Sequence, residues 1–232
     1  MKILALDTAT ENCSAALFIN GTLLAREELL SRGHAERILP MIQELLAESG
    51  VALRELSAVA FGRGPGAFTG VRLAASITQG LAFGAALPVV PVSDLQALAQ
   101  RVLDEHARIT RVLSCTDARM REVYFGAFER GAAGIARAVT EERVSAPAEL
   151  LLPEAWLAGA PELAGAGSGF AAYPELKARL ASRGAQVIAQ LWPRAREIAC
   201  IAAAEAAAGH LRAPGEAIPV YLRDDVARAP QA

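Results

Sequence analysis

The chain has 232 residues, of which 53% are hydrophobic and 21% charged, and its formal net charge is -2. This composition excludes a disordered chain, and the length is sufficient for one large or two small lobes with buried cores. The net charge is slightly negative and no run of basic residues occurs, which argues against a protein that binds nucleic acid mainly by itself.

The first half of the chain alternates short apolar strands with longer helices. Asn20-Gly21 is a strong hairpin signal between two strands, and Ser93 is a good helix N-cap. Strands are expected at 2–6, 13–19, 22–29, 56–61 and 88–92, and helices at 34–48, 69–84 and 94–106.

The second half repeats this pattern, and Asp117 ends its first strand as Asp7 ends the opening one. Strands are expected at 112–116, 123–129, 136–144 and 186–191, and helices at 175–182 and 193–211, before an irregular tail from 214. The fold class is therefore α/β, with two ribonuclease-H-like lobes of the actin-like ATPase or sugar kinase fold. We expect an N-terminal lobe at 1–107 and a C-terminal lobe at 108–232, with the helix 193–211 able to pack back on the first lobe.

Three Cys without paired spacing are typical of a reducing compartment, so we expect a cytoplasmic protein. The stretch 73–93 is uncharged, but Pro88 and Pro91 would interrupt a membrane-spanning helix. No membrane contact is expected. The three His show no metal-ligand spacing, and no nucleophilic triad is suggested, so neither a metal site nor a catalytic residue is expected.

The turn after the first strand carries Asp7, Thr8 and Thr10. A carboxylate at a strand end can hold hydrated Mg²⁺ while turn amides and hydroxyls bind phosphate oxygens. The alternative is that these side chains only satisfy the turn backbone. Ala9 stands where this fold usually has Gly in its phosphate turn, and its methyl group obstructs close phosphate approach.

The string Gly-Arg-Gly-Pro-Gly-Ala-Phe-Thr-Gly-Val-Arg at 62–72 is the most specific feature of the chain. It follows a strand and opens a helix, so its amides, at Gly64 and Gly66 among others, could face an anion and complete a weak nucleotide site for ATP or ADP with Mg. It matches neither the P-loop nor the dinucleotide fingerprint. The alternative is a loop that lets the helix pack closely on a neighbour. A second small-residue loop, 165–169, would border adenosine.

The helices at 34–48 and 69–84 carry more apolar surface than a single core-facing stripe requires. Such a surface is buried either in the protein's own core or against a partner. Both assignments stay open from the pattern alone. The candidate partner-interface residues are Ile38, Met41, Ile42, Leu45, Leu73, Ile77 and Leu81.

Five segments, taken together and in order, resemble the TsaB (YeaZ) family over nearly the whole chain. They are 7–10, 62–72, 92–95 (Val-Ser-Asp-Leu), 117–124 (Asp-Ala-Arg-Met-Arg-Glu-Val-Tyr) and 219–223 (Pro-Val-Tyr-Leu-Arg). The resemblance implies a noncatalytic, cytoplasmic subunit that is needed to form threonylcarbamoyladenosine in tRNAs reading codons that begin with A.

The resemblance also implies partners. This subunit would pair with and activate the catalytic paralogue TsaD, which binds metal. The ATPase TsaE would join that pair. In the absence of TsaD, the chain would form a homodimer through the surface that otherwise contacts TsaD. The complex would make most of the contacts with tRNA. No cofactor would be required. The metal-binding helix of TsaD carries His-x-x-x-His, whereas the matching helix here has His34 and then Ile38.

Two other functions remain open from the residues. The first is an ATP-dependent phosphotransferase on the same fold, in which Asp7, Thr8 and Thr10 would hold Mg-phosphate. The second is a metallopeptidase, which the missing His pair disfavours. Spacing alone assigns no role to Arg63, Arg72 or Arg119.

Overall fold

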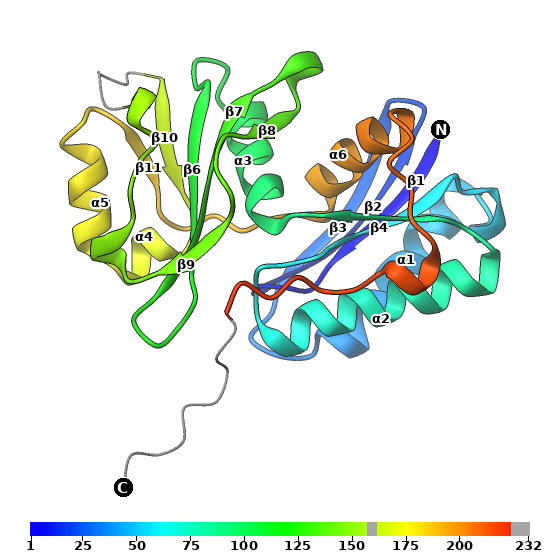
Figure 1. The fold of residues 1–232 in the computed structure, drawn as a ribbon. Helices are drawn as coiled ribbons and strands as arrows, with labels where there is room; N and C mark the ends of the chain where they lie inside the picture. The colour runs from blue at the N-terminus through cyan, green and yellow to red at the C-terminus, as the bar shows by residue number, and fades with distance from the viewer. Residues whose placement is uncertain (157–161, 224–232) are drawn as a thin grey trace, which may run out of the picture.

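The computed structural model describes residues 1–156 and 162–223, which form two lobes that each contain one twisted sheet (Figure 1). In the first sheet the strand order is β3-β2-β1-β4-β5. β1 and β2 run antiparallel, as do β2 and β3, whereas β4 and β5 run parallel to β1. These strands are β1 (Lys2–Asp7), β2 (Asn12–Ile19), β3 (Thr22–Leu29), β4 (Ala58–Gly62) and β5 (Val89–Val92).

The second sheet repeats this arrangement, with the order β11-β10-β6-β7-β8 and β9 paired with β7. Its strands are β6 (Arg111–Asp117), β7 (Val123–Arg130), β8 (Ala136–Ala138), β9 (Arg143–Ser145), β10 (Leu163–Ala166) and β11 (Gln186–Ile188). The helices are α1 (His34–Ser49), α2 (Phe68–Ala85), α3 (Asp94–Glu105), α4 (Gly169–Ala172), α5 (Pro174–Ala181) and α6 (Ala195–Ala207). The two-lobed α/β fold class expected from the sequence is confirmed.

Each sheet is covered on both faces, because alternate residues of a strand point to opposite sides. Leu4 and Leu6 of β1 face the core beneath α1 and α2, whereas Ile3 and Ala5 face α6. The second sheet packs α3 on one face and α4 with α5 on the other. Continuous apolar runs such as Ile3–Leu6 are therefore fully buried, as is expected of a central strand covered by helices.

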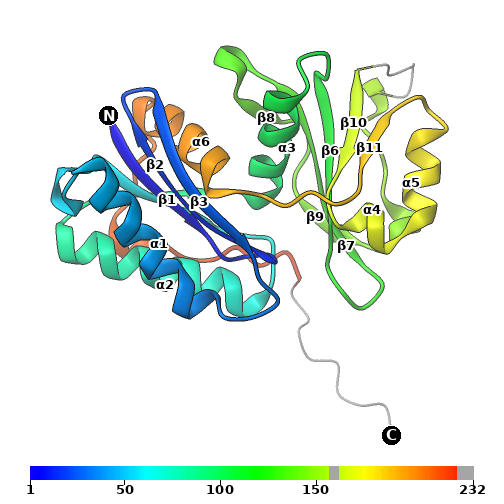
Figure 2. The same cartoon turned by 180° about the vertical axis from the view of Figure 1, so that it is seen from behind.

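The two lobes exchange helices at the centre of the molecule. α3 follows the last strand of the first sheet but packs on β6, β7 and β8 of the second. α6 comes from the second half of the chain but packs on β1, β2 and β4 of the first sheet, and it also contacts α3 (Figures 1 and 2). A boundary near residue 107 therefore does not assign every helix to the lobe on which it packs, because α3 and α6 each pack on the sheet of the other half.

Two elements differ from the expectations. The single strand expected at 136–144 is two short strands, β8 and β9, because residues between them leave the ladder and Thr140 accepts a hydrogen bond from the Ala127 amide. The last helix begins at Ala195 rather than 193, because the Pro193 carbonyl accepts from Asn12 and the Ala195 amide donates to Ser14. Within residues 1–156 and 162–223, no helix is long and apolar enough to cross a membrane.

Candidate functional site: the cleft between the lobes

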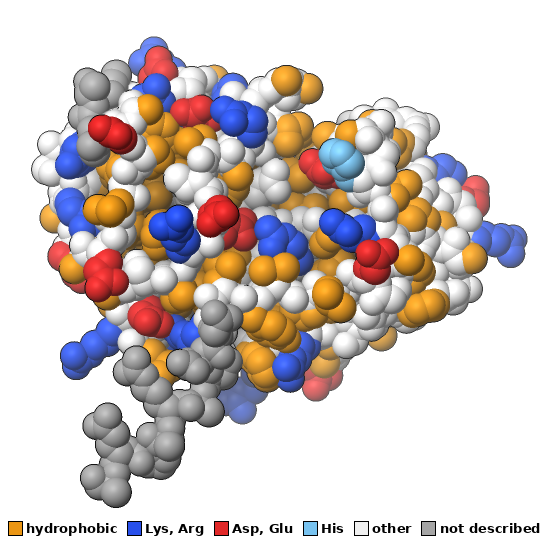
Figure 3. Space-filling view, viewed as in Figure 1, with side chains coloured by type: hydrophobic (Ala, Val, Ile, Leu, Met, Phe, Trp, Pro, Cys, Tyr) orange, Lys and Arg blue, Asp and Glu red, His pale blue; other side chains and the backbone are white. Residues whose placement is uncertain are grey.

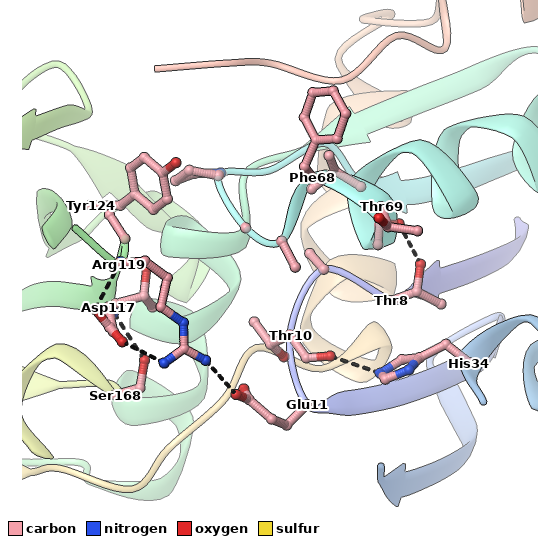
Figure 4. Close-up of a pocket in the computed structure, with 18 of the residues that line it drawn as sticks. Thr8, Thr10, Glu11, His34, Phe68, Thr69, Asp117, Arg119, Tyr124 and Ser168 are labelled. Atoms are coloured by element: carbon pink, nitrogen blue, oxygen red, sulfur yellow. Dashed lines mark hydrogen bonds and ion pairs between the residues drawn. The ribbon is translucent and has the colours of Figure 1, made fainter. Parts of the chain in front are cut away.

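A cleft of about 980 Å³ opens between the two lobes. The turn after β1 and the beginnings of α1 and α2 line it from the first lobe (Figure 4). The β6–β7 loop, α4 and the segment 220–223 line it from the second-lobe side and the C-terminal end of the described chain. In the actin-like architecture a nucleotide would bind in this cleft, so the candidate nucleotide-binding residues are expected to line it.

Asp7 does not reach this cleft. Its side chain is fully buried, and a Cβ at Gly62 would lie 2.8 Å from its Oδ1 and 2.4 Å from Oδ1 of Asp94. Asp7 therefore points behind the loop, toward another carboxyl group, and its Oδ1 accepts a hydrogen bond from the Ala9 amide at 2.8 Å. The expectation that Asp7 holds Mg²⁺ in the cleft is wrong, and the residues present do not fit a magnesium–phosphate group.

The glycine string at 62–72 packs against the turn after β1, so its backbone amides do not form an open anion-binding loop. The Ala67 amide donates to the Ala9 carbonyl at 2.7 Å, and Thr8 Oγ1 donates to the Gly70 carbonyl at 2.7 Å. A Cβ at Gly66 would lie 2.5 Å from the Ala9 carbonyl oxygen, and one at Gly70 would lie 2.1 Å from that of Thr8. The glycines thus allow two backbone segments to touch, which is the close-packing alternative.

Of the five residues expected to bind a nucleotide, Thr8, Thr10 and Gly66 line the cleft, whereas Asp7 and Gly64 do not. Gly64 has a φ of 103° and approaches the Val220 carbonyl, so it serves the contact with the C-terminal segment. Thr10 Oγ1 accepts a hydrogen bond from the Asn12 amide, which satisfies the turn. The structure therefore does not gather these five residues into one set of free ligands.

Gly70→Ala is expected to destabilise the fold by about 1 to 3 kcal/mol, because the new methyl group overpacks a contact between two backbone segments. The matched control is Gly80→Ala in the same helix, since a Cβ at Gly80 meets no atom within 4 Å. That control should raise the stability by up to about 1 kcal/mol, because Ala is the better helix former. Urea unfolding of both variants measures the difference, and equal effects of the same sign would contradict the close-contact account.

The second lobe neutralises its own carboxylate at the equivalent strand end. Asp117 accepts hydrogen bonds from the Arg119 amide at 2.9 Å and from its guanidinium at 3.1 Å. The Arg119 guanidinium also lies 3.9 Å from Glu11, across the cleft (Figure 4). The Asp117 amide donates to Ser168 Oγ at 3.1 Å. Asp117 is therefore held by Arg119, and Ser168 is held by the backbone of the same strand end.

The loop at 165–169, expected to border adenosine, contributes only Ser168 to the cleft wall. A Cβ at Gly167 would lie 2.3 Å from the Cys115 carbonyl oxygen, and one at Gly169 would lie 2.5 Å from Cys115 Sγ. These two glycines therefore serve the packing of α4 on β6. Within residues 1–156 and 162–223, no group of three His, Cys, Asp or Glu side chains is placed to hold a metal ion.

The segment 214–223 forms a strap from the first lobe to the second, and sequence reasoning missed its contacts. The Val220 amide donates to the Arg63 carbonyl at 2.7 Å, and Arg72 Nε donates to the Tyr221 hydroxyl at 2.7 Å. Arg223 then pairs with Glu122 and donates to the Ala118 carbonyl at 3.1 Å. The strap thus crosses the mouth of the cleft, and its motif at 219–223 is explained by these contacts.

The three arginines without an assigned role acquire one from the tertiary structure. The Arg72 guanidinium stacks 3.6 Å from the Phe68 ring centroid and also faces Tyr221, which fixes the strap on α2. Arg63, from the glycine string, pairs at 3.2 Å with Glu142 of the second lobe. Arg119 pairs with Asp117 and Glu11. All three therefore stabilise the arrangement of loops around the cleft.

The expected partner interface is partly wrong. Ile38, Met41, Ile42 and Leu45 of α1 are at most 2% exposed and belong to the core beneath the first sheet. Since they already contact the sheet, they cannot also form a surface for another protein. Leu73, Ile77 and Leu81 of α2 are half-buried; Ile77 and Leu81 pack on the edge of the same core, whereas Leu73 lines the cleft.

The outward face of α2 is instead formed by exposed residues that recur at helical spacing. Phe68 and Phe83 are 47% and 65% exposed, and a Cβ at Gly80 would be in open space. We call this surface the outer α2 face; it consists of Phe68, Arg72, Ser76, Gly80, Phe83 and Gly84. Figure 3 shows hydrophobic side chains gathered over the end of α2 that lies nearest the cleft.

Comparisons with known proteins agree with this structure. A family model for TsaD, the tRNA N6-adenosine threonylcarbamoyltransferase, matches residues 27–230. The tRNA threonylcarbamoyladenosine biosynthesis protein TsaB of Escherichia coli is 44% identical over 98% of this chain and 96% of its own length. The TsaB protein of Haemophilus influenzae is 55% identical over 54% of this chain and 52% of its own length.

A solved structure of YeaZ from Pseudomonas aeruginosa is 42% identical and superposes with a TM-score of 0.84, covering 95% of this chain and 99% of that one. Another Pseudomonas aeruginosa structure, an uncharacterized protein with similarity to the peptidase YEAZ, is 44% identical with a TM-score of 0.88, covering 96% and 99%. The fold, the ordered motifs and the near full-length identity agree, and the chain belongs to the TsaB (YeaZ) family within the TsaD-related proteins.

Proposed function

We propose that this chain is a noncatalytic subunit of the machinery that forms threonylcarbamoyladenosine in tRNA, and that it pairs with and activates a TsaD protein. Its role would be to hold the catalytic paralogue in an active conformation. It would need neither a metal nor a nucleotide of its own for this role, and most contact with tRNA would come from the partners.

The observation that carries the noncatalytic role is that the groups considered for chemistry are buried or bonded to neighbouring residues. Asp7 lies outside the cleft lining, buried beside Asp94, and Asp117 is paired with Arg119. The His34 ring nitrogen Nε2 is bonded to the Thr10 carbonyl at 2.9 Å. Where a second metal-binding His would stand on α1, Ile38 is fully buried in the core. This arrangement supports a structural cleft and disfavours a phosphotransferase or a metallopeptidase.

The surface we propose for the partner is the outer α2 face. Exposed aromatic side chains there are typical anchors of protein interfaces. Ser76 and Gly80 leave room for a second helix to approach closely. A paralogue of the same fold would present equivalent helices, so two helices from each protein would form a four-helix contact. In the absence of TsaD, a second copy of this chain would occupy the same face, and TsaE would join the heterodimer.

Reconstituted transfer of the threonylcarbamoyl group to tRNA tests this function directly. The reaction would contain TsaD, TsaE, ATP and the threonylcarbamoyl donor, with this chain present or omitted. Modification that depends on the chain, with no transfer by the chain alone, is the expected result. Equal modification without the chain would contradict the proposal. Steady ATP turnover by the pure chain that is lost in Asp7→Ala would instead support the phosphotransferase.

A further inference from the structure

We infer that Asp7 and Asp94 share a single proton, forming a buried carboxylic acid–carboxylate pair that ties together the turn after β1, the loop after β4 and the start of α3. The pair lies beside Gly62 and does not line the cleft. It concerns the stability of the fold and is independent of the proposed function.

The geometry places two carboxyl groups together with too few donors. Both side chains are at most 2% exposed. One oxygen of each is satisfied by the backbone, since Asp7 Oδ1 accepts from the Ala9 amide and Asp94 Oδ2 accepts from the Gly64 amide. The remaining oxygens, Asp7 Oδ2 and Asp94 Oδ1, have no hydrogen-bond donor among the described residues. A proton held between the two groups supplies the missing donor and removes one of two buried charges.

Gly62 is the residue that makes this approach possible. A Cβ at this position would lie 2.4 Å from Asp94 Oδ1 and 2.8 Å from Asp7 Oδ1, so any other residue would push the carboxyl groups apart. Glycine is therefore required at position 62 because of the two carboxyl groups, whereas Gly66 and Gly70 are required because of their contacts with the turn after β1. The electrostatics agree with one bound proton. Burial raises the pKa of Asp7 to about 6, and burial together with the Asp7 charge raises the pKa of Asp94 further above its ordinary range.

The charged and titratable groups that face the pair come from three elements. His34 lies at the start of α1, Arg63 in the loop after β4, and Cys13 on β2. Burial and the Asp7 charge raise the pKa of the Cys13 thiol to about 12, so that thiol stays neutral over the range considered. Arg63 forms an ion pair with Glu142. His34 also faces the pair, so a variant at this position is included as a control.

The sign of the pH effect follows from linkage. A carboxyl group whose pKa is raised in the folded state binds more protons there than in the unfolded chain, so stability falls as the pH rises through the interval. For a pKa raised from 3.8 to about 6, the unfolding constant should increase roughly 60-fold between pH 4 and pH 7. Other carboxylates of the chain act in the opposite direction, so the measured quantity is the ratio of the unfolding constants of the native chain and a variant.

Asp94→Asn is the test variant. Its amide oxygen can accept from Gly64, and its amide nitrogen can donate to Asp7, so it replaces the proton with a permanent donor. We expect the ratio of unfolding constants, native over Asp94→Asn, to rise roughly 60-fold from pH 4 to pH 7. Asp7→Asn should show the same trend. Asp104→Asn, at an exposed position of the same helix, should leave the ratio constant, and His34→Gln should retain the native pH dependence.

A ratio that stays constant with pH for Asp94→Asn would overturn the inference. If the Asn variants do not fold, infrared spectroscopy of the native chain decides. At pH 7 a protonated carboxyl band is expected, and its absence would contradict a shared proton. A bound cation is the other way to satisfy the two oxygens. The test is to add KCl or MgCl₂ at pH 8 and measure the midpoint of thermal unfolding. A midpoint that rises in the native chain, but not in Asp94→Asn, would show that a cation and not a proton satisfies the pair, and would overturn the inference.

Discussion

Gly80→Arg is expected to weaken pairing with a TsaD protein strongly while leaving the fold intact. Gly80 lies on the outer α2 face with open space around it, so the isolated chain can accommodate the Arg side chain. A long, charged side chain would prevent a second helix from approaching to the 8 to 10 Å that packed helices require. The dissociation constant should increase by about 30-fold or more, corresponding to about 2 kcal/mol for a central interface residue.

Calorimetric titration of TsaD with the variant measures this loss, and the melting temperature reports on the fold. We expect the melting temperature to be equal to or above that of the native chain, since Gly is a poor helix former. Ala178→Arg is the matched control, because it places the same side chain at an exposed helical position of the second lobe. If Gly80→Arg bound TsaD as tightly as the native chain, the outer α2 face would not be the contact.

Ile42→Asp is expected to damage the fold itself. Ile42 is 2% exposed and packs in the core beneath α1 and α2. The substitution buries an unpaired charge and removes apolar contacts, which together cost about 3 to 5 kcal/mol. For a chain of this size, a loss of that magnitude corresponds to a decrease of roughly 10 °C in the melting temperature.

Thermal unfolding followed by circular dichroism measures the loss for Ile42→Asp. The neighbouring Gln43→Asp is the control, because Gln43 is exposed on the same helix and should change stability by no more than about 0.5 kcal/mol. As a candidate partner-interface residue, Ile42 could instead have faced another protein, and its substitution would then disrupt pairing and spare the fold. A stable Ile42→Asp variant that fails to bind TsaD would restore that view and contradict the core assignment.

The two variants separate what periodicity can and cannot reveal. An apolar residue every three or four positions predicts that one side of a helix is covered, but it does not state what covers it. Ile38 and Ile42 satisfy that pattern for a core and for a partner equally well. The sheet beneath α1 decides in favour of the core. Gly80 and Ser76 contribute nothing to an apolar pattern, and their exposure became informative once the orientation of α2 was known.

The glycine string illustrates the same division. Its position between a strand and a helix was predicted correctly, because Gly, Pro and the following periodicity mark that boundary locally. Its purpose stayed open between an anion site and a tight packing contact, since both need the same residue type. The identity of the neighbours, Thr8 and Ala9 on one side and Asp94 on the other, depends on segments that are distant in the sequence.

The sequence by itself determined the alternation of strands and helices, the duplicated α/β architecture, the hairpin at Asn20-Gly21 and the family of the chain. These follow from local signals, namely periodicity, turn residues and ordered motifs. Only the tertiary structure decided that Asp7 meets Asp94, that Arg223 joins the strap to the second lobe, and that α3 and α6 exchange lobes. Those contacts join residues far apart along the chain, and a carboxylate carries no local signal that distinguishes a cation ligand from a buried, proton-sharing partner.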